Sequence, residues 1–429
     1  MSIAEPSSIA LTRASQLLTL AGSPLPRSGK ASRELGILEH ASLVIADDHI
    51  AWVGPHSEFV ALHERGELPE VGRAQTIHDC AGKVVMPAFV DPHTHLVWGG
   101  DRLDELEQRL AGADYEHIFA AGGGILSSVR QTRGASEQEL FEQSLRRIQR
   151  MQACGTTSFE IKSGYGLELE TELRQLRVAR RLRDEAGVRI KATCMVAHAL
   201  PAEARGSDEA RARCLDSIVD TILPAVAAEG LADYADVFCE RGAFTKAESA
   251  RVLGKAAALG LGLRIHAHEF DHSGGVELAA ELRAKSADHL LVLDERERGL
   301  LRDAGVVAVL LPGTSLVLGK PYADGRALID AGVAVAIATD CNPGSCALEN
   351  LAMVLGLACY GCKLSVAEAI VAATHNAAAS LDLADQVGRL EPGMSADLLV
   401  LATSDHRDLV YHAGSPLIRE VYSRGRRLH

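Results

Sequence analysis

The stretch Val85-Met-Pro-Ala-Phe-Val-Asp-Pro-His-Thr-His-Leu96 is an apolar run that ends in two histidines one residue apart. In a β-strand, successive side chains point to opposite faces, so His93 and His95 share one face. Both imidazoles can then bind one ion, although the pair could also be two polar residues at a strand end. A metal site needs further histidines or a carboxylate at the ends of later strands.

Strand-like runs alternate with helix-like runs through the centre of the chain, a pattern typical of a parallel α/β sheet. We predict eight strands: Val85–His95, Thr156–Lys162, Ile190–His198, Tyr234–Glu240, Leu263–His268, Ala287–Leu293, Val306–Leu311 and Val333–Asp340. Each precedes a predicted helix: Glu137–Cys154, Leu169–Ala186, Asp208–Glu229, Lys246–Leu259, Gly275–Ala284, Glu295–Ala304, Asp324–Ala331 and Leu348–Tyr360. Eight such units predict a (β/α)8 TIM-type barrel, with its active site at the carboxyl ends of the strands.

The two ends of the chain predict short strands separated by turns, at residues 8–21, 41–54 and 76–84 and again at 388–401 and 418–424. We expect these segments to form one small β-sandwich domain together. The predicted boundaries are residues 1–84 and 386–429 for this composite β-domain and residues 85–385 for the barrel.

Charge and composition narrow the class of partner. The chain has 44 basic and 57 acidic residues, a net charge of −13, with no long basic run, which argues against nucleic acid and anionic membranes. We therefore expect a small-molecule substrate. No 18-residue apolar stretch could span a bilayer, and Glu5 and Arg13 interrupt any secretory signal, so we expect a cytoplasmic protein. Nine scattered cysteines, an odd number, make a disulfide framework improbable.

The ends of the predicted strands carry histidines and acids, where a barrel places its chemistry. His93, His95, His266 and Asp340 would supply three nitrogens and one oxygen, a set suited to zinc or ferrous iron with one position left for water. Such an ion would acidify the water toward neutrality. Asp340 could also accept a proton from that water, and His289 could polarise or protonate the substrate oxygen.

The fourth predicted strand ends Phe238-Cys-Glu-Arg241 and offers no lysine that could bridge two ions. We therefore predict one divalent metal ion, zinc or iron.

Several longer motifs resemble those of the imidazolonepropionase family within the amidohydrolase superfamily, from about residue 40 to the end. They are Gly99-Gly-Asp-Arg102, Ala121-Gly-Gly-Gly-Ile125, Ser128-Val-Arg-Gln-Thr-Arg133, Lys162-Ser-Gly-Tyr-Gly-Leu167, Ala197-His-Ala-Leu-Pro201, Asp236-Val-Phe-Cys-Glu240 and Thr339-Asp-Cys-Asn-Pro-Gly-Ser345. The Ser-Gly-Tyr-Gly-Leu and Asp-Cys-Asn-Pro-Gly stretches are more specific than the metal ligands.

This resemblance implies hydrolysis of the ring amide of 4-imidazolone-5-propanoate to N-formimino-L-glutamate, a step of histidine degradation. It implies the same four metal ligands, with Glu269, His289 and Asp340 in catalysis, and favours a homodimer. It further implies substrate contacts from Arg102, Tyr165, His198, Glu269, Asn342, Gly344 and Ser345. The attacking group would be a metal-bound hydroxide or a water held by Glu269, and the resemblance leaves both open.

The residues themselves agree with two of these roles. A guanidinium at Arg102 suits a propanoate carboxylate, although an ion pair with adjacent Asp101, Asp104 or Glu105 is the alternative. Tyr165 lies between two glycines, whose lack of side chains would leave a structural aromatic poorly packed.

Two features depart from the family pattern. His268 stands where the family usually has an acid; alternation would place it on the face of His266, where it could adjust the metal's surroundings, bind a second ion or pack. The segment Pro312-Gly-Thr-Ser-Leu-Val-Leu-Gly319 lacks an expected aromatic pair. Two other functions remain possible: a mononuclear amidohydrolase or deaminase acting on another cyclic amide or an aminopurine, and an inactive paralogue, which would generally have lost metal ligands.

Overall fold

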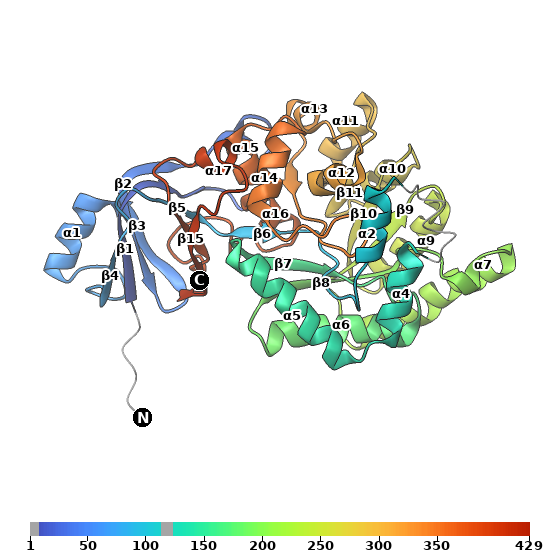
Figure 1. Ribbon diagram of the computed structural model, residues 1–429. Helices are drawn as coiled ribbons and strands as arrows, with labels where there is room; N and C mark the ends of the chain where they lie inside the picture. The colour runs from blue at the N-terminus through green and yellow to red at the C-terminus, as the bar shows by residue number, and fades with distance from the viewer. Residues whose placement is uncertain (1–7, 113–122) are drawn as a thin grey trace.

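The computed structural model describes residues 8–112 and 123–429, which form two separate sheets (Figure 1). One is a barrel of eight parallel strands surrounded by helices. The other is a smaller mixed sheet, built from both ends of the chain, that lies at one end of the molecule. The predicted fold class is confirmed.

The barrel strands follow one another in chain order and pair in parallel. They are β6 (Phe89–Asp91), β7 (Thr156–Lys162), β8 (Arg189–Ala197), β9 (Tyr234–Cys239), β10 (Gly262–Ala267), β11 (Ser286–His289), β12 (Val307–Leu310) and β13 (Val335–Ile337). The segments after β6 and β13 close the ring through a bridge between Thr94 and Cys341. Buried Asp91 strengthens this closure, because its carboxylate accepts hydrogen bonds from both the backbone N–H and the side-chain hydroxyl of Thr339.

Each of the eight predicted helices has a counterpart in the structure, and the helices at residues 312–318, 366–373 and 375–380 are additional. The helices that follow the strands are α5 (Glu137–Ala153), α6 (Leu169–Asp184), α7 (Asp208–Ser217), α8 (Leu223–Ala228), α9 (Lys246–Ala258), α10 (Gly275–Glu281), α11 (Glu295–Ala304), α12 (Pro312–Leu318), α13 (Gly325–Asp330), α14 (Leu351–Tyr360), α15 (Val366–Ala373) and α16 (His375–Ser380). Helices α2 (Leu103–Leu110) and α4 (Ile125–Gly134) lie in the long connection between β6 and β7, on either side of residues 113–122. The single helix predicted at Asp208–Glu229 is interrupted by a π-turn, Ile218–Ile222, just before Pro224, which has no backbone N–H to donate.

The smaller sheet has the order β16-β15-β14-β5-β1-β2-β3, with β4 also paired to β1. Its strands are β1 (Ser8–Leu18), β2 (Ile37–Ala46), β3 (His49–Pro55), β4 (Thr76–Asp79), β5 (Val84–Pro87), β14 (Leu398–Leu401), β15 (Ile418–Ser423) and β16 (Arg426–Arg427). Helix α1 (His56–Arg65) covers part of it, and α17 (Asp408–Tyr411) lies between β14 and β15. The predicted union of the two chain ends is therefore confirmed.

The predicted first barrel strand, Val85–His95, is divided in the structure. Its first part is β5, which pairs with β1 and β14 of the smaller sheet. Only β6 joins the barrel, where it pairs with β7. His93 and His95 therefore follow a short strand rather than end a long one.

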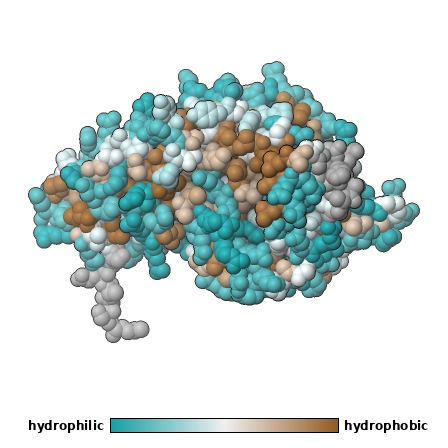
Figure 2. Space-filling view, viewed as in Figure 1, coloured by the Kyte–Doolittle hydropathy of each residue, from teal (hydrophilic) through white to brown (hydrophobic). Residues whose placement is uncertain are grey.

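In the space-filling view, hydrophilic side chains cover most of the visible face (Figure 2). Among the described residues, no helix combines the length and apolarity needed to cross a membrane. All nine cysteines are free thiols, as expected.

Candidate metal centre

Four histidines and one aspartate meet at the carboxyl ends of the barrel strands. Ligand atoms of His93, His95 and Asp340 lie within 4.8 Å of one another, and so do those of His93, His266 and His289. All five side chains are buried. The four predicted metal ligands are thus brought together around His93, with His289 beside them.

Two buried carboxylates orient two of these imidazoles. Asp288 Oδ2 accepts a hydrogen bond from His93 Nδ1 at 2.7 Å, and Asp236 Oδ2 lies 3.0 Å from His266 Nδ1. A carboxylate on one ring nitrogen fixes the tautomer and turns the other nitrogen toward a metal ion.

The remaining nitrogens fit a divalent cation. Nε2 of His93 and Nε2 of His266 are buried and have no hydrogen-bond partner in the described part of the chain, as does Nδ1 of His95. Burial lowers the pKa of His93 and of His95 well below the ordinary value, with neighbouring positive groups acting in the same direction. Neutral imidazoles with unpaired lone pairs are the state in which histidine binds zinc or iron.

Asp340 is held by an unusual backbone and by a neighbouring hydroxyl. Its φ of 52° lies in the left-handed region, where an aspartate is tolerated but uncommon. Thr314 donates to its Oδ2 at 2.5 Å, while Oδ1 lies 3.5 Å from His93 Nε2. Burial raises the pKa of Asp340 to about 6, against the lowering effect of Thr314 and His266.

The Thr314 contact was not predicted from the sequence. Thr314 belongs to the segment 312–319, which was singled out only because it lacks an expected aromatic pair. The segment forms α12, and its buried first turn supplies the hydroxyl that contacts Asp340.

Glu269 lies next to this cluster, just after β10. Its Oε2 is 3.7 Å from His289 Nδ1, and Glu240 Oε2 accepts from its backbone N–H at 2.9 Å. Burial, with the carboxylates of Asp340 and Glu240 acting in the same direction, raises the pKa of Glu269 to about 8. A carboxyl group that titrates near neutrality is suited to proton transfer.

His198 and Tyr165 form the neighbouring wall. The His198 ring stacks on His95, with centroids 4.9 Å apart, and lies 5.4 Å from the Tyr165 ring. Burial lowers the pKa of His198 to about 3, and its Nδ1 contacts the carbonyl of Gly164 at 3.1 Å. The imidazole is therefore neutral, with Nδ1–H donated to Gly164 and Nε2 left as an acceptor.

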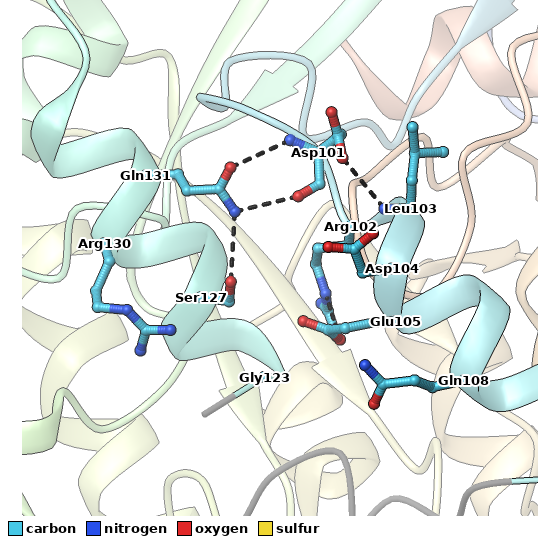
Figure 3. Close-up of a pocket in the computed structure, with 10 residues that line it drawn as sticks. All are labelled: Asp101, Arg102, Leu103, Asp104, Glu105, Gln108, Gly123, Ser127, Arg130 and Gln131. Atoms are coloured by element: carbon cyan, nitrogen blue, oxygen red, sulfur yellow. Dashed lines mark hydrogen bonds and ion pairs between the residues drawn. The ribbon is translucent and has the colours of Figure 1, made fainter. Parts of the chain in front are cut away.

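Arg102 lies at the start of α2, beside a cavity of about 350 Å³ with mostly polar walls (Figure 3). Its Nε donates to Glu105 Oε2 at 2.8 Å, so the alternative of a local ion pair is present in the structure. The guanidinium also lies against Gly344, because a Cβ built there would be only 2.0 Å from Nη1. These contacts place Arg102 beside the predicted substrate-binding turn.

The turn that follows Asp340 is organised by Asn342. Its Oδ1 accepts from the backbone N–H groups of Gly344 and Ser345, both at 2.8 Å, and its Nδ2 donates to the Asp340 carbonyl at 2.7 Å. The Asn342 side chain is thus committed within the turn. Its contacts connect the position of Asp340 to that of Gly344 and Ser345.

Beneath the histidines lies a fully buried charge cluster that the sequence alone did not reveal. Lys162 Nζ lies 2.8 Å from both Glu160 Oε1 and Asp236 Oδ2, and 3.6 Å from Asp288 Oδ2. Arg264 lies 3.7 Å from Asp288 and donates to the Pro92 carbonyl at 2.9 Å. The signal available in the sequence was the presence of charged residues within otherwise apolar strands.

His268 does not share the face of His266, contrary to the expectation from strand alternation. Strand β10 ends at Ala267, and His268 has a φ of 56°, which breaks the alternation. Its Nδ1 contacts the Val292 carbonyl at 3.1 Å. The imidazole is fully buried on a different side of the turn, next to His272. It therefore does not orient the ligands of the first cluster.

The Ala121–Ile125 motif lies partly outside the described residues. Gly123 borders the cavity in Figure 3, and Gly124 donates its N–H to Glu105 Oε1 at 3.1 Å.

Comparison with known proteins agrees with this geometry. The model of the "Amidohydrolase family" matches residues 84–428. The chain belongs to the amidohydrolase family. Imidazolonepropionase from Symbiobacterium thermophilum is 44% identical over 423 residues, covering 98% of this amidohydrolase and 97% of the relative. Imidazolonepropionase from Geobacillus kaustophilus is 45% identical over 403 residues, covering 94% and 93%.

Solved structures of low sequence identity share the fold. A zinc-containing adenosine deaminase from Xanthomonas campestris has a TM-score of 0.68 at 20% identity, covering 98% of this amidohydrolase and 92% of that chain. The guanine deaminase of E. coli has a TM-score of 0.71 at 15% identity, covering 99% of both chains. At these identities the likeness concerns the fold alone.

Proposed function

We propose that this protein hydrolyses the ring amide of 4-imidazolone-5-propanoate to N-formimino-L-glutamate, the activity of an imidazolonepropionase. The observation that carries the proposal is the position of Arg102 against Gly344, in the turn that follows Asp340. This contact supports the proposal because a guanidinium, which can bind a carboxylate, lies beside the turn after Asp340, and the substrate has both a propanoate and a cyclic amide. The near full-length similarity to imidazolonepropionases supports the same activity.

The proposal includes one divalent ion, zinc or iron, held by His93, His95, His266 and Asp340. When bound, such an ion polarises a carbonyl oxygen and lowers the pKa of a coordinated water toward 7. The unpaired buried nitrogens of the three histidines support this assignment. Asp288 and Asp236 hold the His93 and His266 rings in position for it.

The protein's own groups account for the proton transfers of the reaction. Water adds to the ring carbonyl carbon, the carbon–nitrogen bond breaks, and the leaving ring nitrogen takes up a proton. Glu269, with a pKa of about 8, can accept a proton from the water and return it to that nitrogen. We assign contact with the substrate oxygen to His289, whose Nδ1 lies 3.7 Å from Glu269 Oε2.

Binding of the substrate is assigned to groups around this centre. Arg102 binds the propanoate. Asn342 accepts hydrogen bonds from the backbone of Gly344 and Ser345 and so fixes this turn, in which Gly344 lies against Arg102. Tyr165 and His198 lie beside His95 and can offer a hydroxyl and an imidazole to the ring.

The direct test is a turnover assay with freshly generated 4-imidazolone-5-propanoate, followed by loss of its ultraviolet absorbance. Metal-loaded protein should consume the substrate, and the His93→Ala variant should not. If metal-loaded protein leaves the absorbance unchanged, the proposed substrate is wrong. Other cyclic amides and aminopurines would then be assayed, because a deaminase shares the fold.

The Glu269→Gln variant tests the catalytic assignment within the same assay. Metal content should be unchanged, and turnover should fall by about 10²- to 10⁴-fold because a proton-transfer group is lost. Glu281→Gln is a suitable control, since Glu281 is exposed and pairs with Lys246. Full turnover in Glu269→Gln would remove Glu269 from the chemistry.

A further inference from the structure

A second group of possible metal ligands lies beyond the turn that follows β10. His268, His272 and Glu297 each offer a ligand atom within 4.8 Å of the others. The two imidazole rings have centroids 5.3 Å apart. None of these residues belongs to the cluster around His93.

His268 carries the unpaired atom of this group. Its side chain is fully buried, and Nδ1 donates to the Val292 carbonyl at 3.1 Å, which leaves Nε2 as an acceptor. That Nε2 is buried and has no hydrogen-bond partner among residues 8–112 and 123–429. A buried, unpaired acceptor costs about 1–3 kcal/mol, and a metal ion satisfies it. Donation of the other ring N–H to a backbone carbonyl is the usual arrangement of a histidine ligand.

Glu297 supplies a negative charge beside both imidazoles. Its Oε2 accepts the Asp294 N–H at 2.8 Å as part of the N-terminal cap of α11. Its Oε1 accepts a hydrogen bond from His272 Nδ1 at 3.0 Å, which leaves His272 Nε2 as the nitrogen available to an ion, and lies 3.7 Å from His268 Nδ1. The carboxylate is thus fixed by the helix and presents one oxygen to the histidine pair.

Glu277 adds negative charge near the same group. Its Oε2 is buried without a hydrogen-bond partner in the described residues, while Oε1 accepts from Arg296 at 3.0 Å. Its carboxylate acts electrostatically on both His268 and His272. The surroundings therefore favour a cation.

We propose that His268, His272 and Glu297 form a second binding site, for a divalent transition-metal ion such as Zn²⁺. Two nitrogens and one carboxylate oxygen are a ligand set that zinc accepts, with a fourth position left for water. The His272 side chain is half exposed, so the ion can reach the site from solvent. This inference does not depend on the proposed hydrolysis.

The site would join the turn carrying Glu269 to α11. Glu240 already fixes one side of that turn through the backbone N–H groups of Glu269 and Phe270. A metal ion bound by His268 and His272 would link the residues on either side of Glu269 to Glu297 of α11. The role we assign to the ion is therefore to stabilise this turn.

The experiment is a count of bound zinc. Full-length protein is stripped with a chelator, dialysed against Zn²⁺ and analysed for metal by mass spectrometry. The wild type should bind two equivalents, and His272→Ala should bind one fewer. Glu297→Gln should lose the same equivalent, since glutamine can still close the helix cap. His412→Ala, at another exposed histidine, is the control and should keep both.

The His93→Ala variant separates this site from the first. It should lose one equivalent and keep the one that depends on His272. If His272→Ala and Glu297→Gln both bind as much zinc as the wild type, the second site does not exist, whatever the outcome of the substrate assay.

Discussion

Replacement of Asp288 by asparagine tests how the buried carboxylates support the metal centre. The variant keeps the shape of the side chain and removes one negative charge from the partner of His93. Loss of a carboxylate that orients a histidine ligand reduces metal affinity by about 10- to 100-fold, or roughly 1.4–2.7 kcal/mol.

The structure indicates that the fold should survive this change. The buried cluster has two cations, Lys162 and Arg264, and three carboxylates, those of Glu160, Asp236 and Asp288. With asparagine at position 288, the cluster still has two cations and two carboxylates. Lys162 keeps its two nearest partners at 2.8 Å, because Asp288 lies farther away at 3.6 Å. The variant therefore loses orientation of a ligand without leaving a buried cation unpaired.

The assay is a zinc titration in competition with a chromophoric chelator, performed in the His272→Ala background so that the first site is measured alone. Thermal unfolding of the metal-free protein is recorded beside it. Asp382→Asn is the control, because Asp382 is half exposed and pairs with Lys285 far from the histidines. Affinity within twofold of the parent would refute the orienting role of Asp288, and loss of folding would refute the charge argument.

Three further predictions follow from the site. Because burial raises the pKa of Glu269 to about 8, the carboxylate form of Glu269 is lost as pH falls below that value. The kcat/KM of the metal-loaded wild type should therefore rise with pH up to about 8, and the Glu269→Gln variant should lack this increase. Gly344→Ala places a Cβ against Arg102, so KM should rise while kcat changes less, measured by steady-state kinetics; an unchanged KM would contradict the contact. Thr314→Val removes the hydroxyl on Asp340 and should weaken zinc binding about tenfold in the competition titration, as expected for a hydrogen bond to a charged group.

The strand and helix pattern was predictable because each barrel unit carries its own signal. An apolar run gives the strand, and helix-period runs such as Glu295–Ala304 match the structure residue for residue. The division of Val85–His95 was not predictable in the same way. Both halves are apolar, and only pairing with β1 and β14, distant in sequence, assigns β5 to the smaller sheet.

The candidate site shows a similar division. Histidines at strand ends could be recognised, since few other reasons place them there. The direction of the His268 side chain could not be predicted, because it depends on a backbone φ of 56° that no local sequence pattern requires. The contact between Thr314 and Asp340 was likewise not predictable, because it arises only when the first turn of α12 lies against the turn that follows β13.

Burial and the neighbouring charges explain why His93 stays neutral and oriented in a low-dielectric interior. A carboxylate beside a histidine normally raises its pKa, yet burial and the neighbouring Lys162 keep the pKa of His93 well below the ordinary value. Lys162 pairs with Asp236 and Arg264 lies near Asp288; Asp288 accepts the Nδ1–H of His93, and Asp236 Oδ2 lies 3.0 Å from His266 Nδ1. Each carboxylate thus balances a cation and fixes a tautomer. Replacing Lys162 by methionine should therefore disturb both functions at once, lowering zinc affinity and stability together, whereas Asp288→Asn should lower affinity alone.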